Sequence, residues 1–477
     1  MLSGKIGSSV ARVESDASAA ASPEIASDLT LETEGARRRA IYVISALTLA
    51  NTLNHLDRQI VSILAEPIKL EFSLADWELG ILTGLSFALL YGIASFPLAH
   101  LADRTNRARV ISTCLALWSL FTALGGIAQS YAQLLASRVL VGVAEAGGAA
   151  PSQSLIADMT PRNNRATALA LFSIGIPLGS FLGMTMGGIL ADSHGWRMGM
   201  ILAGLPGIAL AVLLAFTLRD PRGKPGTKSR DVLGNGTPRL SITSFLYDVR
   251  TVFRVRSFRY ITFGGACISF VNYSQSAFLA SFFFRSYSEE LNRITAAELA
   301  VVGLSFGASA FLGLVLGAAK GIPGVIGTLW GGRLTDRLAD RTLESFATLP
   351  AVATWLRIPL IVGVLLAPSL ELALVFVVLQ AFVIGIAAPA GFASVQGLVH
   401  PSSRAMAASI YLFALNVVGL GLGPLTVGFF SDYLQFSGMT TGEGLRWALL
   451  SSGIVILALG GWLKWRAKDS IAKEMVS

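Results

Sequence analysis

Two adjacent charged residues, Asp57 and Arg58, lie in the middle of an apolar segment that runs roughly from residue 40 to residue 64. A second pair, Arg138 and Glu145, lies in another apolar segment. Charged side chains are costly at bilayer depth, and they generally face the interior of a helix bundle or a water-filled pathway. Two carboxylates and two guanidinium groups inside an apolar bundle therefore indicate a transport pathway that handles protons.

The spacing of Arg138 and Glu145 places both on one face of a helix, about 10 Å apart along its axis. The residues from Gly142 to Ala150 are almost all small, which allows close helix packing and leaves space around the carboxylate. Loss of water favours a protonated carboxyl group, whereas a nearby guanidinium favours the carboxylate. This competition suits a proton-binding group, and the alternative is a static ion pair that fixes helix packing.

Asp57 and Arg58 are neighbours on a helix, so their side chains diverge by about 100°. We expect one to face a cavity and the other a neighbouring helix, and the alternative is again a structural pair. Other polar residues are candidates for the cavity wall: His55, Asn272, Tyr273 and Gln275. For His55 a satisfied polar side chain is the favoured interpretation over a proton relay.

The composition is that of a membrane protein. Apolar residues make up 53% of the 477 residues and charged residues 14%, against about 25% charged residues in soluble domains. The net charge of +8 collects in alternate short loops, which favours a membrane orientation signal over nucleic-acid binding. Cys114 and Cys267 lie in different apolar segments and predict no disulfide framework.

No resident cofactor is expected. The four histidines are scattered without the spacing of a metal site, and no Gly-x-x-x-x-Gly-Lys-Ser/Thr loop supports an ATP-driven pump. The sequence indicates a transporter, not an enzyme, with neither metal nor nucleotide.

The apolar runs predict an all-α polytopic membrane protein with twelve transmembrane helices. The expected spans are near 40–64, 78–101, 108–128, 133–156, 166–190, 198–218, 258–284, 302–335, 348–368, 371–398, 404–430 and 446–465. The eighth run is too long for one simple span, and we expect Gly321, Pro323 and Gly324 to break or kink it. Lys320 and Arg357 also lie in long apolar stretches; neither is assigned a role, and a snorkelling Arg357 would reach the cytoplasmic interface.

Lysine and arginine follow the positive-inside pattern. They gather at residues 37–39, 104–109 and 162–165 and throughout 219–259, whereas the alternate loops hold few. Both termini and the long central loop are therefore predicted to be cytoplasmic. For a bacterial-type protein this places the chain in the plasma (inner) membrane.

The domain organisation follows from an internal repeat. Leu101-Ala-Asp103-Arg104 corresponds to Leu334-Thr-Asp336-Arg337, and Gly188-Ile-Leu-Ala-Asp192 corresponds to Gly428-Phe-Phe-Ser-Asp432, at nearly the same offset. A duplicated six-helix unit places the binding site between two pseudo-symmetric halves. The expected parts are a disordered cytoplasmic tail (1–36), an N-terminal half (37–218), a cytoplasmic linker with an amphipathic helix near 242–255 (219–257), a C-terminal half (258–466) and a cytoplasmic tail (467–477).

The loop motifs resemble those of the major facilitator superfamily. Asp103-Arg104-x-x-Arg107 resembles the signature after the second helix, and Asp336-Arg337 resembles its second copy. Ala99 stands where the family usually has Gly. The resemblance implies that Asp103, Arg104, Arg107, Asp336 and Arg337 form a cytoplasmic gate that closes when the transporter opens outward. Turn chemistry with positive-inside charge is the alternative.

A narrower resemblance is to the spinster family, a branch associated with sphingolipid and lysophospholipid transport. It rests on Asn54-His55-Leu56-Asp57-Arg58, on Ser137-Arg138 through Gly142-Val-Ala-Glu145-Ala146, and on Gly421-Leu-Gly423-Pro424. His55 departs from the aromatic residue that is usual at its position.

The predicted function is that of a monomeric, proton-coupled secondary transporter that moves a lipid-like amphiphile by alternating access. A carrier of small organic anions or drugs is one alternative, and a membrane receptor or scaffold without transport is another. The sequence does not specify the substrate, the direction of transport or its stoichiometry.

The topology has a direct test. A cysteine introduced at Gly226, in the basic central loop, should react in intact cells with a membrane-permeant thiol reagent and not with an impermeant one. Labelling of intact cells by the impermeant reagent would contradict a cytoplasmic central loop.

Overall fold

A computed structural model describes residues 23–161, 164–221, 250–298, 307–339, 341–399 and 404–475, and the regular structure within these ranges is helical. Helices are expected here because a bilayer offers backbone groups no hydrogen-bond partners outside the segment. Among the described residues, eight helical segments are long and apolar enough to cross a membrane: Asp76–Arg104, Arg107–Gly125, Thr167–Thr217, Ala308–Ala339, Ser345–Leu366, Leu370–Val395, Met406–Phe436 and Thr441–Glu474.

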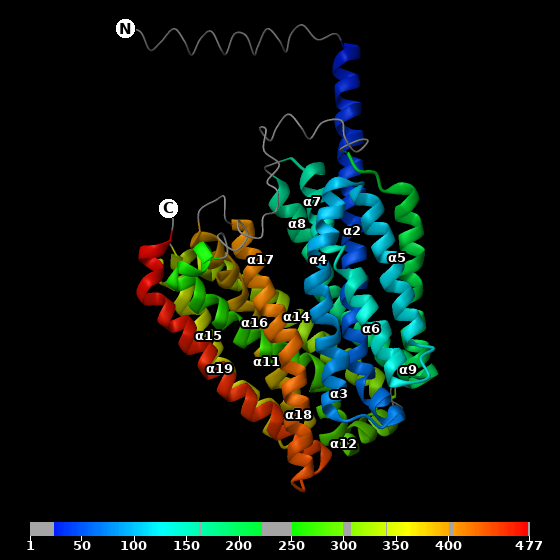
Figure 1. Cartoon of the computed structure of the whole chain (residues 1–477), viewed down its shortest axis with the longest axis vertical. Helices are drawn as coiled ribbons and strands as arrows, with labels where there is room; N and C mark the ends of the chain where they lie inside the picture. Colours follow the sequence, from blue (N-terminus) through cyan, green and yellow to red (C-terminus); the bar gives the residue numbers. More distant parts are fainter. Residues whose placement is uncertain are drawn as a thin grey trace.

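The helices up to residue 217 form one group, called the N-terminal group below, on the right of Figure 1. Its elements are α2 (Pro23–Phe72), α3 (Asp76–Gly80), η1 (Ile81–Leu85), α4 (Ser86–Arg104), α5 (Arg107–Gly125), α6 (Tyr131–Glu145), α7 (Ala149–Met159), α8 (Arg165–Ser173) and α9 (Gly175–Thr217). Because α2 begins at Pro23, the expected disordered tail to residue 36 is wrong for residues 23–36.

Helix α9 is a hairpin of two helical arms joined at Gly195. This glycine has φ 79° and ψ 164°, outside the helical region, and a positive φ is readily adopted only by glycine. The arms pack against α2 and α14 on one side of the turn and against α5 on the other.

The helices from residue 256 onward form the C-terminal group: α11 (Arg256–Ser286), α12 (Ser288–Arg293), η3 (Ile294–Glu298), α14 (Ala308–Ala339), α15 (Ser345–Leu366), α16 (Leu370–Gly397), α17 (Arg404–Ala414), η5 (Leu415–Leu422), α18 (Gly423–Phe436) and α19 (Thr441–Glu474). Helix α14 runs through Pro323 without interruption, so the helix does not break there, and the kink stays a prediction. Of the predicted amphipathic helix, residues 242–249 lie outside the described residues.

A stripe of glycines brings α2 against α9. Gly175, Gly179, Gly183 and Gly187 recur every fourth residue on α9, and a Cβ atom at Gly183 would lie 2.6 Å from the carbonyl oxygen of Leu56. Small residues at this spacing let two helix backbones approach closely in a membrane. The stripe therefore fixes the part of α2 that carries Asp57 and Arg58.

The apolar core joins the two groups at one end only. One cluster contains Ile60, Leu64, Phe278, Phe282 and Leu449, from α2, α11 and α19, and so belongs to both groups. Toward the other end the core divides into a cluster built almost entirely from the N-terminal group and another from the C-terminal group. We call the joined end the Asp76 end and the other the Asp103 end.

The repeated aspartates cap helices of the opposite group at the Asp76 end. Asp432 accepts hydrogen bonds from the backbone N–H groups of Asp76 (2.9 Å) and Trp77 (2.8 Å), at the start of α3. Asp192 accepts from the N–H groups of Ser309 (3.3 Å) and Ala310 (2.7 Å), at the start of α14. Each carboxylate thus meets a helix N-terminus, where backbone donors lack intrahelical partners. The two contacts are related by the internal repeat.

Asp76 is the centre of a buried polar network between the groups. Its carboxylate accepts two hydrogen bonds from Arg285 (2.9 and 3.0 Å) and one from Ser431 (2.7 Å), and it pairs with Lys69. Arg285 also pairs with Glu66 at 2.9 Å. Because Asp76 is fully buried, this network closes the Asp76 end against water.

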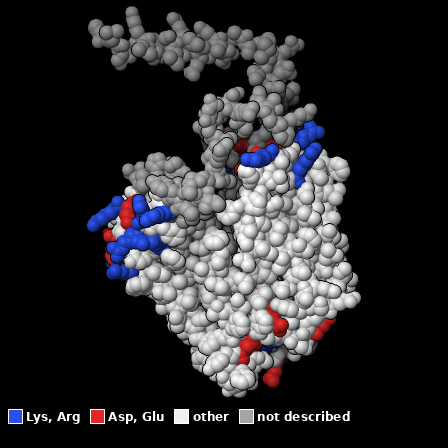
Figure 2. Space-filling model, in the orientation of Figure 1, with Lys and Arg blue, Asp and Glu red and all other residues white. Residues whose placement is uncertain are grey.

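Charged side chains are distributed unevenly over the visible surface. Figure 2 shows lysine and arginine gathered at the Asp103 end of both groups and acidic residues at the Asp76 end, with an uncharged band between them. Such an uncharged band between two charged ends is typical of a protein whose central part lies in a membrane.

The capping aspartates predict a shift in conformation. In Asp432→Asn one side-chain oxygen becomes an NH₂ group that faces a backbone N–H, and a hydrogen bond to a charged group contributes about 1.5–3 kcal/mol. We expect Asp432→Asn, Asp192→Asn and above all the double variant to populate states with a separated Asp76 end. Electron-spin distances between labels on α3 and α18 measure this separation.

A matched control is Asp469→Asn on α19, where the carboxylate pairs with Arg466 of the same helix at 3.8 Å. It should leave the distances unchanged. Distance distributions of the double variant that match those of the unsubstituted protein would contradict the role of the two caps.

Candidate functional site

Glu145 and Arg58 form an ion pair deep inside the N-terminal group. The Nε and Nη2 atoms of Arg58 lie 2.9 and 2.8 Å from the same oxygen of Glu145, Oε2. Glu145 is 1% exposed. Breaking a buried pair by removing one partner costs about 3–5 kcal/mol, because the remaining charge is left uncompensated. The pair therefore couples α2 to α6.

Two aromatic rings of α4 hold the guanidinium of Arg58. Its Cζ atom lies 4.4 Å from the ring centre of Phe87 and 5.1 Å from that of Tyr91. The backbone of α4 can approach α6 closely because Gly142 has no side chain; a Cβ atom there would lie 2.9 Å from the carbonyl oxygen of Phe87. Cation–π contacts of this kind orient the charge without neutralising it.

Asp57 points away from Arg58 and toward α5. Its Oδ2 atom accepts a hydrogen bond from the Thr122 hydroxyl at 2.8 Å, and its Oδ1 atom has no partner among the described residues. Asp57 is 2% exposed. The divergence of the two neighbouring side chains follows from the 100° rotation per residue of a helix.

Arg138 is buried without an ion pair among the residues that the structure describes. Its Nε and Nη1 atoms lack acceptors, as does the Oε1 atom of Glu145. Arg138 nevertheless lies within electrostatic range of Asp57, Glu145 and Arg58. The four charges sum to zero, yet three of the four side chains keep an unsatisfied polar atom. Asp57, Arg138 and Glu145 therefore each have a polar atom that could accept or donate a further hydrogen bond.

The ion-pair partner of Glu145 is Arg58 on α2 and not Arg138 on its own helix. Residues seven positions apart on one helix are about 10 Å apart, beyond direct contact, whereas Arg58 reaches Glu145 across the interface between α2 and α6. The contacts of Thr122, Phe87 and Tyr91 were not predicted, because no periodicity within one helix indicates its neighbours on another.

Helix α6 ends at Glu145. The chain makes a short turn through Gly147 and Gly148, whose N–H groups donate to the carbonyls of Ala144 (3.3 Å) and Glu145 (3.0 Å), before α7 begins at Ala149. Pro151, in the first turn of α7, has no N–H to continue the ladder. The carboxylate thus lies at the partially negative end of α6, where a positive partner such as Arg58 is especially favourable. The glycine pair followed by Pro151 was the sequence signal for this break.

The predicted gate residues lie at the Asp103 end. Asp103, Arg104, Asp336 and Arg337 are exposed, and within the described ranges none of them forms an ion pair between the two groups.

Arg107 has a different environment from the other predicted gate residues. It is 1% exposed and pairs with Asp158 (2.7 Å) and Asp220 (2.8 Å), both from the N-terminal group. Its partners attach α7 and the segment after α9 to the start of α5. In this conformation Arg107 therefore stabilises one group internally.

The other side chains that were predicted to line the cavity lie in different environments and do not form one site. His55 contacts the carbonyl oxygen of Asn51 through Nδ1 at 3.1 Å, and Tyr273 packs against the apolar cluster of the N-terminal group. Gln275 accepts a hydrogen bond from Gln380 at 2.5 Å within the C-terminal group. Asn272 accepts one from Arg357 at 2.7 Å.

Arg357 is 2% exposed. The expectation that it snorkels to the interface is therefore wrong, because its side chain turns inward to Asn272. No group of three or more His, Cys, Asp or Glu side chains suited to a metal occurs among the described residues.

Comparison with known proteins agrees with this architecture. The sequence model of the Major Facilitator Superfamily matches residues 47–322. An MFS-type efflux pump of Mycolicibacterium smegmatis is 31% identical over 95% of this chain and 98% of its own. The sphingosine-1-phosphate transporter SPNS2 of Danio rerio is 25% identical over 88% of this chain and 81% of its own.

Among solved structures, a bacterial homologue of the human lysosomal transporter spinster, in an inward-facing and unoccupied conformation, superposes with a TM-score of 0.76. It is 29% identical in sequence, and the match covers 92% of this chain and 99% of that one. The family match, the relatives and the similar structure are all membrane transporters, which is consistent with charged residues buried in an apolar helix bundle. The chain therefore belongs to the Major Facilitator Superfamily of membrane transporters and is similar to its spinster branch.

Proposed function

We propose that this protein is a proton-coupled secondary transporter in which Glu145 and Asp57 bind and release the proton, with Arg58 and Arg138 as their charge partners. The observation that carries the proposal is the ion pair between the buried Glu145 and the partly exposed Arg58, beside Arg138, which has no ion pair among the described residues. Protonation of Glu145 would release Arg58, and Arg138 is placed to stabilise whichever carboxylate stays ionised. A change of one pKa unit between two conformations supplies about 1.4 kcal/mol, which shifts their ratio tenfold.

The full architecture that we propose has twelve transmembrane helices in two six-helix halves. Eight helical segments among the described residues are long and apolar enough to cross a membrane. Division of α9 at Gly195, joining of α6 with α7, and inclusion of α2 and α11 bring the number to twelve. Helices α6 (15 residues) and α7 (11 residues) are each too short to be counted alone, because the chain turns between them.

The orientation we propose places the Asp103 end in the cytoplasm. Lysine and arginine gather there (Figure 2), in keeping with the positive-inside rule. The Asp76 end would then face outward and is closed by the network of Asp76, Arg285 and Glu66. This arrangement corresponds to an inward-facing state, the conformation named for the similar spinster homologue.

A single-chain amphiphilic lipid is the substrate class that we favour. Arg58, whose side chain is 22% exposed, offers a charge for a headgroup, and the partly exposed ring of Tyr91 offers apolar surface beside it. The name of the SPNS2 relative supports this class. The name of the efflux-pump relative gives no substrate, and a small organic anion or drug stays the alternative.

The coupling hypothesis is tested by Glu145→Gln, which resembles the protonated carboxyl group at nearly constant volume. We expect proteoliposomes with this variant to lose most of the dependence of transport on an imposed pH gradient, because Arg58 is no longer held by a titrating partner. Asp57→Asn should reduce the same dependence. An unchanged pH profile in both single variants and in the double variant would contradict proton coupling at this cluster.

The same proteoliposomes distinguish the substrate classes. Uptake of a labelled lysophospholipid or sphingoid base, competed by other lysolipids, supports the amphiphile. Uptake of a small hydrophilic anion that no lysolipid affects would favour the alternative carrier. Absence of flux for both, with intact binding, would favour a receptor or scaffold.

The gate that we propose at the Asp103 end closes in the outward-facing state. Asp103→Asn should then raise the inward-facing population. The substitution removes a salt bridge that is expected only in the outward-facing state, in which the Asp103 end is closed. A solvent-exposed ion pair contributes under about 1 kcal/mol. A change of more than about fivefold in the ratio of the two states would therefore require that the Asp103 ion pair is buried when the gate closes. Label distances between α4 and α14 at this end give the populations, and an unchanged distribution would count against the gate.

A further inference from the structure

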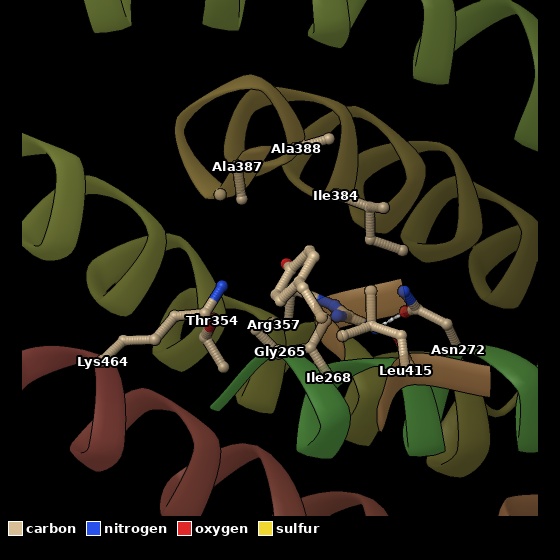
Figure 3. A pocket seen from close by; sticks show the side chains of 13 residues that line it. Gly265, Ile268, Asn272, Thr354, Arg357, Ile384, Ala387, Ala388, Leu415 and Lys464 are labelled. Atoms are coloured by element: carbon tan, nitrogen blue, oxygen red, sulfur yellow. Dashed lines mark hydrogen bonds between the residues drawn. The ribbon is translucent and has the colours of Figure 1, made fainter. Parts of the chain in front are cut away.

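We propose that the C-terminal group contains a binding site for a compact oxyanion between Arg357 and Lys464, for which a phosphate group carries the matching charge. Both side chains line one cavity of about 150 Å³ (Figure 3). Arg357 comes from α15 and Lys464 from α19. The site is separate from the cluster around Glu145, which α2, α5 and α6 build within the other group.

Both cations are buried and lack a counter-charge. Arg357 is 2% exposed and Lys464 is 5% exposed. The Nη2 atom of Arg357 donates to the Asn272 amide oxygen at 2.7 Å, and its Nε atom has no acceptor. Neither residue forms an ion pair within the described ranges, and the two cations lie near enough to repel each other. A neutral amide satisfies one N–H group but leaves the charge uncompensated.

The sequence explains why the chain itself does not supply the missing anion. Helices α11, α15 and α17 and the segment η5 contain no Asp or Glu, and α16 has only Glu371, in its first turn. In α19 no acidic residue lies between the first turn and Asp469, which pairs with Arg466. By contrast, the buried Arg107 and Arg285 each have two carboxylate partners.

Small residues keep the space between the cations open. A Cβ atom at Gly264 would lie 2.8 Å from Cγ of Lys464, and one at Gly265 would lie 2.9 Å from the Tyr411 ring. Ala387 and Ala388 of α16 line the opposite side in Figure 3. The glycines therefore let Lys464 enter the bundle, and the alanines leave room for a ligand.

The donors and the volume define the ligand class. A guanidinium presents a planar set of donors that suits carboxylate and phosphate oxygens, and an ammonium adds a compact point charge. Two positive charges match a phosphate monoester, which carries about −1.5 to −2 at neutral pH. Water in the cavity would solvate the cations without neutralising them. The volume admits an ionic group but not a long acyl chain, so the ligand is a free phosphate or the headgroup of an amphiphile.

The test uses the purified full-length protein in a neutral detergent without phosphate, with equilibrium binding of radiolabelled inorganic phosphate as the readout. We expect Arg357→Gln and Lys464→Gln each to weaken binding at least tenfold. Arg466→Gln and Lys468→Gln, which remove the same charge from α19 outside the cavity, are the matched controls and should bind as the unsubstituted protein does.

Thermal unfolding separates loss of the site from loss of the fold. Phosphate should raise the Tm of the unsubstituted protein more than chloride at equal ionic strength. The double variant Arg357→Met, Lys464→Met removes two unpaired buried charges, so without phosphate its Tm should be no lower than that of the unsubstituted protein. Phosphate should no longer raise it. A general folding defect would lower the Tm instead.

A second ligand identifies the source of the anion. Competition of bound phosphate by a lysolipid with a phosphate monoester headgroup, and not by the neutral monoacylglycerol of equal chain length, assigns the site to a headgroup. Failure of both to compete assigns it to a free ion. If the lysolipid binds but inorganic phosphate does not, and Arg357→Gln and Lys464→Gln both weaken lysolipid binding, the site is also assigned to a headgroup.

The proposal is overturned if neither phosphate nor the lysolipid binds, or if binding and Tm respond equally in cavity variants and controls. These measurements need no proton gradient, so they are independent of whether the cluster at Glu145 couples transport to protons.

Discussion

The structure depends on how each charge inside an apolar bundle is compensated. Moving a charge from water into low-dielectric surroundings is unfavourable unless an opposite charge and hydrogen bonds replace the lost solvation. Arg58 meets Glu145 across two helices, and Arg107 meets Asp158 and Asp220 across three segments. The ion pairs therefore determine which helices must stay together, and a change in protonation at one of them acts directly on helix packing.

The two groups of helices are joined at the Asp76 end and have separate cores toward the Asp103 end. At the Asp76 end, a shared apolar core and two capping aspartates connect the groups, whereas toward the Asp103 end each group has its own core. Asp192 and Asp432 place their charge on helix N-termini of the opposite group, so a rotation of one group against the other would break both contacts together. An arrangement of this kind favours two discrete states over continuous bending.

The buried arginines fall into two classes with different consequences. Arg107 and Arg285 are fully paired and stabilise one arrangement. Arg138 and Arg357 keep unsatisfied donors, and we propose that an exchange of partners satisfies the first and a ligand the second. Arg138 lies beside two carboxylates that can titrate, whereas Arg357 lies beside Lys464 and no carboxylate. The same physical cost is the basis of both proposals, proton binding in one group and anion binding in the other.

The sequence by itself determined the helical, membrane-embedded class, the internal repeat and the choice of Asp57, Arg58, Arg138 and Glu145. These follow from the length of apolar runs and the cost of charge at bilayer depth, which need no tertiary information. Which charges pair was decided only by the tertiary structure.

Periodicity places Arg138 and Glu145 on one face of a helix, but the glycine stripe of α9 and the break after α6 bring Arg58 to Glu145 instead. Arg357 turns inward for a similar reason, because Asn272 lies on a neighbouring helix whose rotation no single segment encodes. Contacts within a helix follow from spacing along the chain, whereas contacts between helices depend on crossing angle and rotation, which many weak packing interactions fix together.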